Sequence, residues 1–273
     1  MHVGRRMNKK LRLVSGSGGG WTSIQPYVDV GLVEPMYVRD WQNPFQTMHR
    51  LTLGWWPADP ADPKSPLIQP SQQKNYNDIG AIAFDSTTEI CEWIMGDVVQ
   101  REARGEIRVS TESLPAKFKD GETWFGTPAR AVFGTIQNNI AQFIAQSKGI
   151  AGKYIMWTAL ELKTTDELGK VPVYAPEIIG KAKSSIAPAW FDDTLHLQLV
   201  VVGKNPVRRM WLTQHYDEND RIPYVAKCRA PKECPLPDYL DGEDCSLGVF
   251  FDKLEVAQQK ASQIVQNKLK GNI

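Results

Sequence analysis

The chain has 273 residues, of which 42% are hydrophobic and 23% charged, and its formal net charge is +1 at pH 7. This composition is typical of a globular protein with a sizeable core, and such a small net charge does not by itself indicate binding to nucleic acid or membranes. The basic first residues lack the apolar stretch of a signal peptide, and no apolar run approaches the roughly 20 residues of a membrane span. We therefore expect a cytoplasmic protein without membrane association.

A glycine-rich stretch, VSGSGGGWTS, follows a short apolar segment at Lys10–Val14 that predicts a buried strand. Phosphate-binding loops need glycines because backbone N–H groups must approach the phosphates closely. They also need a lysine for the terminal phosphates and a Ser or Thr for Mg²⁺. On the G-x-x-x-x-G-K-[ST] pattern, Ser15 replaces the first glycine, Trp21 replaces the lysine and Thr22 keeps the hydroxyl. In isolation the stretch fits a glycine-rich turn as well as a phosphate loop.

Two further predicted strands end in aspartates. The segment 34–40, EPMYVRD, ends at Asp40, and the apolar run Ile79–Phe84 is followed by Asp85. The residues Ser86-Thr-Thr-Glu89 fit a capping box, so a helix is expected to begin directly after this aspartate. A carboxylate at this place can position Mg²⁺ beside a phosphate loop. It is equally typical of residues that precede helices, since Asp favours helix N-termini.

The remaining segments predict an α/β sheet followed by a more hairpin-like end. The proline-rich residues 57–73 predict a surface loop, and the polar residues 101–123 predict a second excursion. Apolar spacing and turn residues then predict these elements: a helix from Thr127-Pro128 to Gly149, a strand at Tyr154–Thr158, a hairpin of Leu195–Val202 and Met210–His215 with its turn at Asn205-Pro206, and an amphipathic helix at Leu247–Leu269.

The four cysteines do not predict a metal site. Cys228, Cys234 and Cys245 lie in one region, but they form no C-x-x-C pair and the nearest histidine is His215. We expect these thiols and that of Cys91 to be reduced and partly buried.

In this order the segments resemble the RecA-like P-loop ATPases of phage genomes, which include recombination and annealing-associated ATPases. The glycine stretch is at the phosphate-loop position, EPMYVRD resembles the strand with the acidic water-activating residue, and IGAIAFDSTTEI resembles Walker B. YIMWTALE resembles the sensor strand, and the segments around GKAKSS and YVAKCRAP follow. The resemblance spans residues 11 to about 240.

The resemblance implies a mainly parallel sheet flanked by helices, with an antiparallel C-terminal extension. The RecA-like P-loop NTPase domain would occupy residues 1–245, with surface insertions near 57–75 and 101–123. Residues 246–273 would form the C-terminal amphipathic helix.

The same resemblance implies a site for ATP and Mg²⁺. Asp40 and Glu161 would orient the attacking water, and Thr22 and Asp85 would hold Mg²⁺. Lys181 would supply the cation that the loop lacks, in cis or from a neighbouring subunit. The implied nucleotide-binding residues are Gly16, Ser17, Gly18, Gly19, Gly20, Trp21, Thr22, Ser23 and Lys181.

Three departures from the family pattern argue against efficient hydrolysis. Trp21 replaces the lysine, Asp40 stands where a glutamate is usual, and Leu160 takes the place of a polar sensor. The loss of the lysine removes a charge that offsets the phosphates, and a bulky indole crowds the same space. The chain is therefore expected to be a degenerate ATPase.

Two functions remain open from the sequence. The first is a RecA-like nucleotide-binding protein in phage DNA recombination or replication, which forms a homo-oligomer and contacts single-stranded DNA and other phage proteins. A basic edge for DNA would come from Arg208, Arg209, Lys227 and Arg229. The second is a catalytically inactive RecA-fold protein that serves as a structural or assembly component of a phage particle or complex. The first places the protein in the host cytoplasm, the second in a virion.

Overall fold

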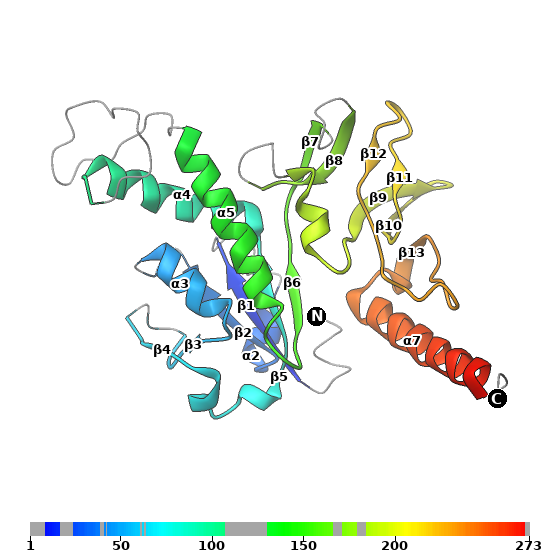
Figure 1. Cartoon of the computed structure of the whole chain (residues 1–273), viewed down its shortest axis with the longest axis horizontal. Coiled ribbons are helices and arrows are strands. Elements are labelled where there is room, and N and C mark those ends of the chain that lie inside the picture. Colours follow the sequence, from blue (N-terminus) through cyan, green and yellow to red (C-terminus); the bar gives the residue numbers. More distant parts are fainter. Residues whose placement is uncertain are drawn as a thin grey trace.

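The computed structural model describes residues 9–16, 24–38, 41, 43–60, 62, 64–106, 130–165, 171–178 and 184–270. The protein has a mixed α/β architecture (Figure 1). A four-stranded parallel sheet flanked by helices comes first in the chain. Two further sheets and a long C-terminal helix follow.

The parallel sheet has the strand order β2-β1-β5-β6. Its strands are β1 (Lys10–Ser15), β2 (Val33–Tyr37), β5 (Ile79–Asp85) and β6 (Tyr154–Trp157), and all three pairings are parallel. In β5 every residue before Asp85 is buried, because helices cover both faces of the sheet. The prediction of a strand buried on both faces is therefore confirmed.

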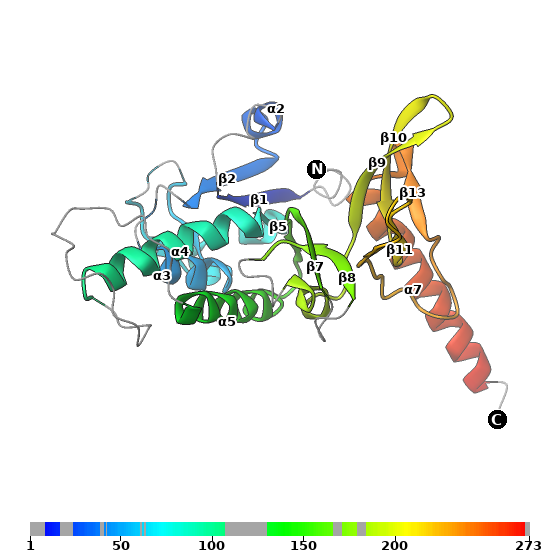
Figure 2. The same cartoon turned by 90° about the horizontal axis from the view of Figure 1, so that it is seen from above.

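The helices lie on opposite faces of this sheet (Figure 2). The short α2 (Gln25–Asp29) covers one face, and α3 (Pro44–Leu51), α4 (Thr87–Ala103) and α5 (Arg130–Ser147) cover the other. Successive side chains of a strand point to opposite faces of the sheet, so β5 contributes side chains to the packing on both faces. Ile82 and Phe84 pack with the three larger helices, whereas Ala83 packs with the residues around α2.

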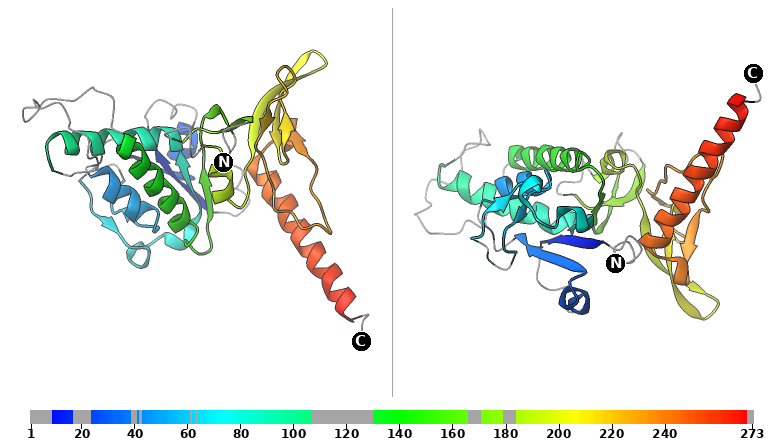
Figure 3. Two further views of the ribbon diagram at one scale, coloured as in Figure 1. Left: turned by 45° about the horizontal axis from the view of Figure 1, so that its top comes forward. Right: turned by 90° about the horizontal axis from the view of Figure 1, so that it is seen from below.

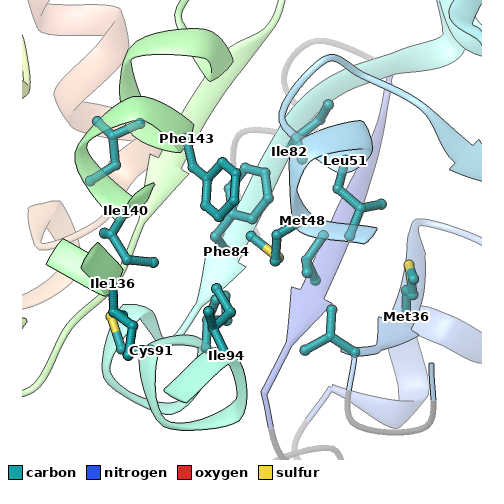
Figure 4. Packing of buried hydrophobic residues seen from close by; sticks show 14 of the residues in the cluster. Met36, Met48, Leu51, Ile82, Phe84, Cys91, Ile94, Ile136, Ile140 and Phe143 are labelled. Atoms are coloured by element: carbon teal, nitrogen blue, oxygen red, sulfur yellow. The ribbon is translucent and has the colours of Figure 1, made fainter. Parts of the chain in front are cut away.

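The main core fills the space between the sheet and the three larger helices (Figure 4). Phe84 is fully buried and stacks on Trp157 of the neighbouring strand with ring centroids 4.1 Å apart. Around these rings lie the following buried side chains: Met36, Met48, Leu51, Ile82, Cys91, Ile94, Ile136, Ile140 and Phe143. The regularly spaced apolar side chains of α5 thus face the core, as predicted. The predicted start of this helix at Thr127 lies outside the described residues.

The proline-rich segment contains more regular structure than the predicted loop. The antiparallel ladder of β3 (Trp56–Pro57) with β4 (Leu67–Ile68) begins at its edge, and the 3₁₀ turn η3 (Pro70–Gln72) lies within it. A second 3₁₀ turn, η4 (Tyr76–Asp78), follows it. The Gln73 amide donates to the carbonyl oxygens of Gly54 and Ile68 and accepts from the buried Arg12 guanidinium. These bonds tie the segment to β1.

The C-terminal half holds two further sheets. The first has the order β11-β12-β8-β7, with β7 (Glu161–Thr165), β8 (Pro172–Pro176), β11 (His215–Tyr216) and β12 (Pro223–Tyr224). The second is antiparallel in the order β13-β10-β9, with β9 (His196–Val202), β10 (Asn205–Trp211) and β13 (Tyr239–Asp241). The 3₁₀ turns η5 (Ala187–Trp190) and η6 (Gly242–Asp244) flank β9 and β13 in the chain.

The β9–β10 hairpin turns earlier than predicted. Its two turn residues are Gly203 and Lys204, not Asn205-Pro206. Gly203 has φ +67°, and a glycine at the first central position suits a type II′ turn, which matches the twist of the strands. The second strand therefore begins at Asn205 rather than at the predicted Met210.

The last element is α7 (Leu247–Lys270), in agreement with the predicted amphipathic helix. Phe250 packs into a second core with Met210, Leu212 and Leu240 of the antiparallel sheet and its neighbouring loop. The rest of the helix extends away from that sheet (Figures 1 and 3). Within the described part of the chain, no helix has both the length and the apolar character that crossing a bilayer requires.

Candidate functional site

The candidate site lies where the parallel strands end. The carboxyl ends of β1, β5 and β6 are neighbours, because the three strands are adjacent and parallel. Ser15 is in register with Asp85, and the Gly16 N–H donates to the Asp85 carbonyl oxygen over 3.0 Å. The glycine-rich stretch therefore begins directly beside the aspartate at the end of β5.

The chain leaves β1 and β5 in opposite directions. After β1 it crosses the α2 face to reach β2, and after β5 it crosses the α4 and α5 face to reach β6 on the other side. Such a reversal opens a crevice outside the carboxyl ends of the two strands, which is where open α/β sheets bind ligands. The strand order thus brings Gly16 and Asp85 to the switch point of the sheet, the position at which open α/β sheets commonly bind ligands.

The side chain of Asp85 points into solvent at this edge. It is exposed, although every preceding residue of β5 is buried. Its Oδ1 accepts a hydrogen bond from the Thr158 hydroxyl, which directly follows β6. The Thr158 backbone also bonds to β5 and α4, since its N–H donates to Phe84 and its carbonyl accepts from Thr87. Asp85 therefore has a carboxylate that is accessible to solvent and whose orientation is fixed by Thr158. Such a carboxylate can bind a cation beside a phosphate.

Helix α4 begins at the same crevice. Its N-cap is Ser86, whose Oγ accepts from the Glu89 N–H at 3.3 Å, which is one half of the predicted capping box. The first turn lies against the end of β1: a Cβ added at Gly16 would be 2.5 Å from the Cβ of Glu89. Only glycine permits this approach, which brings both the α4 N-terminus and the carboxylate of Glu89 to the end of β1.

The predicted site residues divide into two groups. Gly16, Asp85 and Glu161 are described, and the first two lie together in the crevice. The other predicted residues lie outside the described part of the chain: Ser17, Gly18, Gly19, Gly20, Trp21, Thr22, Ser23, Asp40 and Lys181. In the described part, no group of three or more His, Cys, Asp or Glu side chains is arranged to hold a metal ion.

Glu161 lies in a different environment from the one predicted. It begins β7, and its Oε2 is 2.7 Å from Nε2 of His196 on β9. Burial raises the pKa of Glu161, and the charge of Asp217 adds to this effect. Its partner in the described residues is thus a histidine of the second sheet, and not Asp85.

A column of stacked rings extends from this pair. The rings of Tyr174, Tyr224 and His196 stack with centroids 4.5 and 4.4 Å apart. His215 stacks on Trp211 at 4.0 Å, and its Nε2 lies 3.1 Å from Nδ1 of His196. The column joins strands of both C-terminal sheets. Burial lowers the pKa of each histidine to about 4, so both imidazoles are neutral at pH 7.

A cavity of about 820 Å³ separates the outer edge of β6 from the C-terminal elements. Its apolar lining includes Tyr154 and Phe251, whose rings are 4.3 Å apart, and its polar lining includes Thr158, Glu161 and His196. This volume is in the range of small-molecule sites. Thr158 lines this cavity and also bonds to Asp85, so the cavity lies close to the end of β5.

Sequence reasoning missed Thr158 and the two histidines. Thr158 was recognised as the end of a strand, but a hydroxyl there becomes informative only when β6 is known to lie beside β5. His196 and His215 are 19 positions apart and have no metal-ligand or catalytic spacing. Only the packing of the two C-terminal sheets against each other brings them together.

Comparison with known proteins adds no assignment. No protein-family model matches the chain, and no curated protein matches it.

Proposed function

We propose that the protein binds a nucleoside triphosphate with Mg²⁺ in the crevice between the carboxyl ends of β1 and β5, without efficient hydrolysis. The observation that carries the proposal is the position of the glycine stretch: it begins at Gly16, whose N–H bonds to the backbone of Asp85 at the point where the chain reverses direction. Backbone N–H groups of the stretch would face the phosphates.

Each residue of the crevice has a proposed part. Asp85 holds Mg²⁺ through its exposed carboxylate, and Thr158 fixes the orientation of that carboxylate. Thr22 supplies a hydroxyl to the metal, as the resemblance implies. Trp21 leaves the terminal phosphate without the usual lysine, so the site would bind the nucleotide more weakly and hydrolyse it poorly.

The family assignment is a further part of the proposal. A RecA-like NTPase of phage type, acting in recombination or replication, is supported by the order of the segments and by the parallel sheet that they form. ATP is accordingly the nucleotide to test first. Asp40 and Lys181 keep the roles that the resemblance implies, as water-orienting residue and substitute cation. Glu161 is less suited to water activation, since its carboxylate bonds to His196.

Calorimetric titration with ATP, with and without Mg²⁺, tests the proposal. Binding that requires Mg²⁺ supports it, and no heat of binding at millimolar ATP contradicts it. Asp85→Asn should weaken Mg²⁺-dependent binding about tenfold or more, equivalent to about 1.4 kcal/mol. The control Asp62→Asn changes an exposed carboxylate of another loop and should leave the affinity unchanged. Equal affinities of Asp85→Asn and the wild type would refute the metal role.

The lysine position can be tested in the opposite direction. Trp21→Lys restores the P-loop charge and should tighten ATP binding about tenfold, because a hydrogen bond to a charged group contributes roughly 1.5–3 kcal/mol. Unchanged affinity would contradict the proposed register of the loop. Release of inorganic phosphate from ATP should stay at background in the wild type. Rapid release would refute the proposed lack of hydrolysis, although it would not contradict nucleotide binding.

A structural role remains the second candidate function. It is favoured by the exposed apolar edge of β9, which offers a surface for another protein chain. Under this reading the RecA-like fold serves in a phage particle or complex without bound nucleotide.

A further inference from the structure

Strand β9 is an exposed and apolar sheet edge. It is the outermost strand in the order β13-β10-β9, and no described strand pairs with its outer side. Leu197, Leu199 and Val201 alternate along it and are 62%, 67% and 74% exposed. The hairpin of β9 and β10 projects beyond the neighbouring elements (Figures 2 and 3).

The free backbone groups of this edge belong to the same three residues. In a hairpin with a two-residue turn, the pair that closes the turn, here Val202 and Asn205, is hydrogen-bonded, and bonded pairs then alternate along the strands. Val201 faces Pro206, which has no N–H, and this agrees with a non-bonded pair. The N–H and C=O groups of Leu197, Leu199 and Val201 therefore point outward.

The edge lacks the devices that normally prevent strand pairing. Natural edge strands carry charged residues, prolines or bulges that block the addition of another strand. The segment 195–202, LHLQLVVV, has no Asp, Glu, Lys, Arg or Pro. Its pairing with β10 is continuous from His196 to Val202 without a register shift. The edge is thus open to another strand of matching pattern.

We propose that β9 pairs antiparallel with β9 of a second copy of this chain, in a two-fold register centred on Leu199. In this register Leu199 faces Leu199 of the partner subunit, and Leu197 faces Val201 of the partner subunit. Each facing pair exchanges two backbone hydrogen bonds. The apolar rows of the two strands join on one face and form a continuous surface across a sheet that spans both copies.

The sequence around β9 favours a second copy as the occupant. A two-fold contact centred on Leu199 pairs residue i with residue j and j with i, so the outward-facing residues that meet are Leu197, Leu199 and Val201, all of them apolar. The same register places Lys204 near the amino end of the partner strand, beside Asp193 of the partner subunit. In one copy Asp193 accepts the Arg229 N–H and forms no ion pair with a described side chain. Lys204 in the turn of one copy and Asp193 before β9 of the other therefore have complementary charges.

The two Arg208 side chains are kept apart in this arrangement. Arg208 lies on β10 opposite Leu199, so three strand spacings, roughly 14 Å, separate it from Arg208 of the partner subunit. This exceeds the Debye length of about 8 Å at physiological salt. His196 is neutral at pH 7, because burial lowers its pKa to about 4. Because each copy uses the same edge, the contact is complete with two copies and leads to a dimer. It does not depend on the proposed nucleotide binding.

Light scattering after size-exclusion chromatography tests the dimer. A short strand interface is at the small end of interface sizes, so protein concentrations of about 10–100 μM are appropriate. The wild type should have the mass of a dimer, and Leu199→Lys should be a monomer, because it places two lysines opposite each other. The control Leu269→Lys changes an equally exposed leucine of α7 and should remain a dimer. A monomeric wild type, or a dimeric Leu199→Lys, overturns the proposal.

Cysteine cross-linking tests the register. Facing residues of a bonded pair have Cα atoms about 5.5 Å apart, within the range of a disulfide. Leu199→Cys should form a covalent dimer under mild oxidation, and Val201→Cys alone should not. A mixture of Leu197→Cys and Val201→Cys should give the mixed dimer. The wild type, oxidised in parallel, controls for the four native cysteines. Cross-linking of Val201→Cys in place of Leu199→Cys overturns the register.

Discussion

Gly16→Ala tests how closely β1 and α4 meet at the crevice. The added Cβ would lie 2.5 Å from the Cβ of Glu89, 3.1 Å from its Oε2 and 3.2 Å from its carbonyl carbon. Ordinary contacts begin at 3.4 Å, so the strand end and the helix must separate by about 1 Å. Rotation of the Glu89 side chain cannot relieve the clash, because the nearest atom is its Cβ, which does not move when the side-chain torsions change.

The helix cannot move away freely. Ile90 and Ile94, which follow Glu89 on α4, are fully buried in the main core. Overpacking of this kind costs about 1–3 kcal/mol of unfolding free energy. For a chain of this size each kcal/mol lowers Tm by roughly 2–4 °C. The same displacement should weaken nucleotide binding, since the glycine stretch begins at this residue.

Urea unfolding followed by circular dichroism measures this cost. The matched control is Gly96→Ala within α4, where the added Cβ meets no atom within 4 Å. This change should stabilise the protein by roughly 0.5–1 kcal/mol, because alanine is the better helix former. If Gly16→Ala were as stable as the wild type, the close approach of β1 and α4 would be refuted.

Three further predictions follow from the site and the core. Thr158→Val removes the hydroxyl that bonds to Asp85 and should weaken Mg²⁺-dependent ATP binding without loss of folding; unchanged calorimetric affinity would exclude an orienting role for Thr158. Phe84→Ala opens a cavity beneath Trp157 and should cost about 3–5 kcal/mol in urea unfolding, and a loss below 1 kcal/mol would contradict this packing. Since the pKa values of His196 and His215 are about 4 in the folded state against 6.5 in the unfolded chain, unfolding releases neutral imidazoles that take up protons below pH 6.5. Stability should therefore fall as pH falls from 7 towards 4, and His215→Phe, which keeps a ring in the column, should show a shallower loss; an equal slope would refute the buried neutral histidine.

The local elements could be predicted where the pattern of the residues is strong. The run Ile79–Phe84 and the serine after Asp85 predict a buried strand and a capped helix, and both are present. The apolar spacing of Leu247–Leu269 likewise predicts α7. The strands β7 and β8 were missed, because each has only five residues without a clear polar–apolar alternation, and β8 has a proline at each end, which is typical of loops. The β10 start was misplaced, because Asn205-Pro206 is a common turn pair and Gly203 has a left-handed φ only in the folded hairpin.

The sequence by itself determined the glycine stretch, the aspartate at the end of β5 and the missing lysine, because these are matters of residue type and order. Tertiary structure decided which of these residues meet. The adjacency of β1 and β5 brings Gly16 to Asp85, and the pairing of β5 with β6 adds Thr158. It also gave Glu161 a histidine as partner and left β9 at an open edge. Strand pairing joins segments far apart in the chain, and no local pattern records which strands become neighbours.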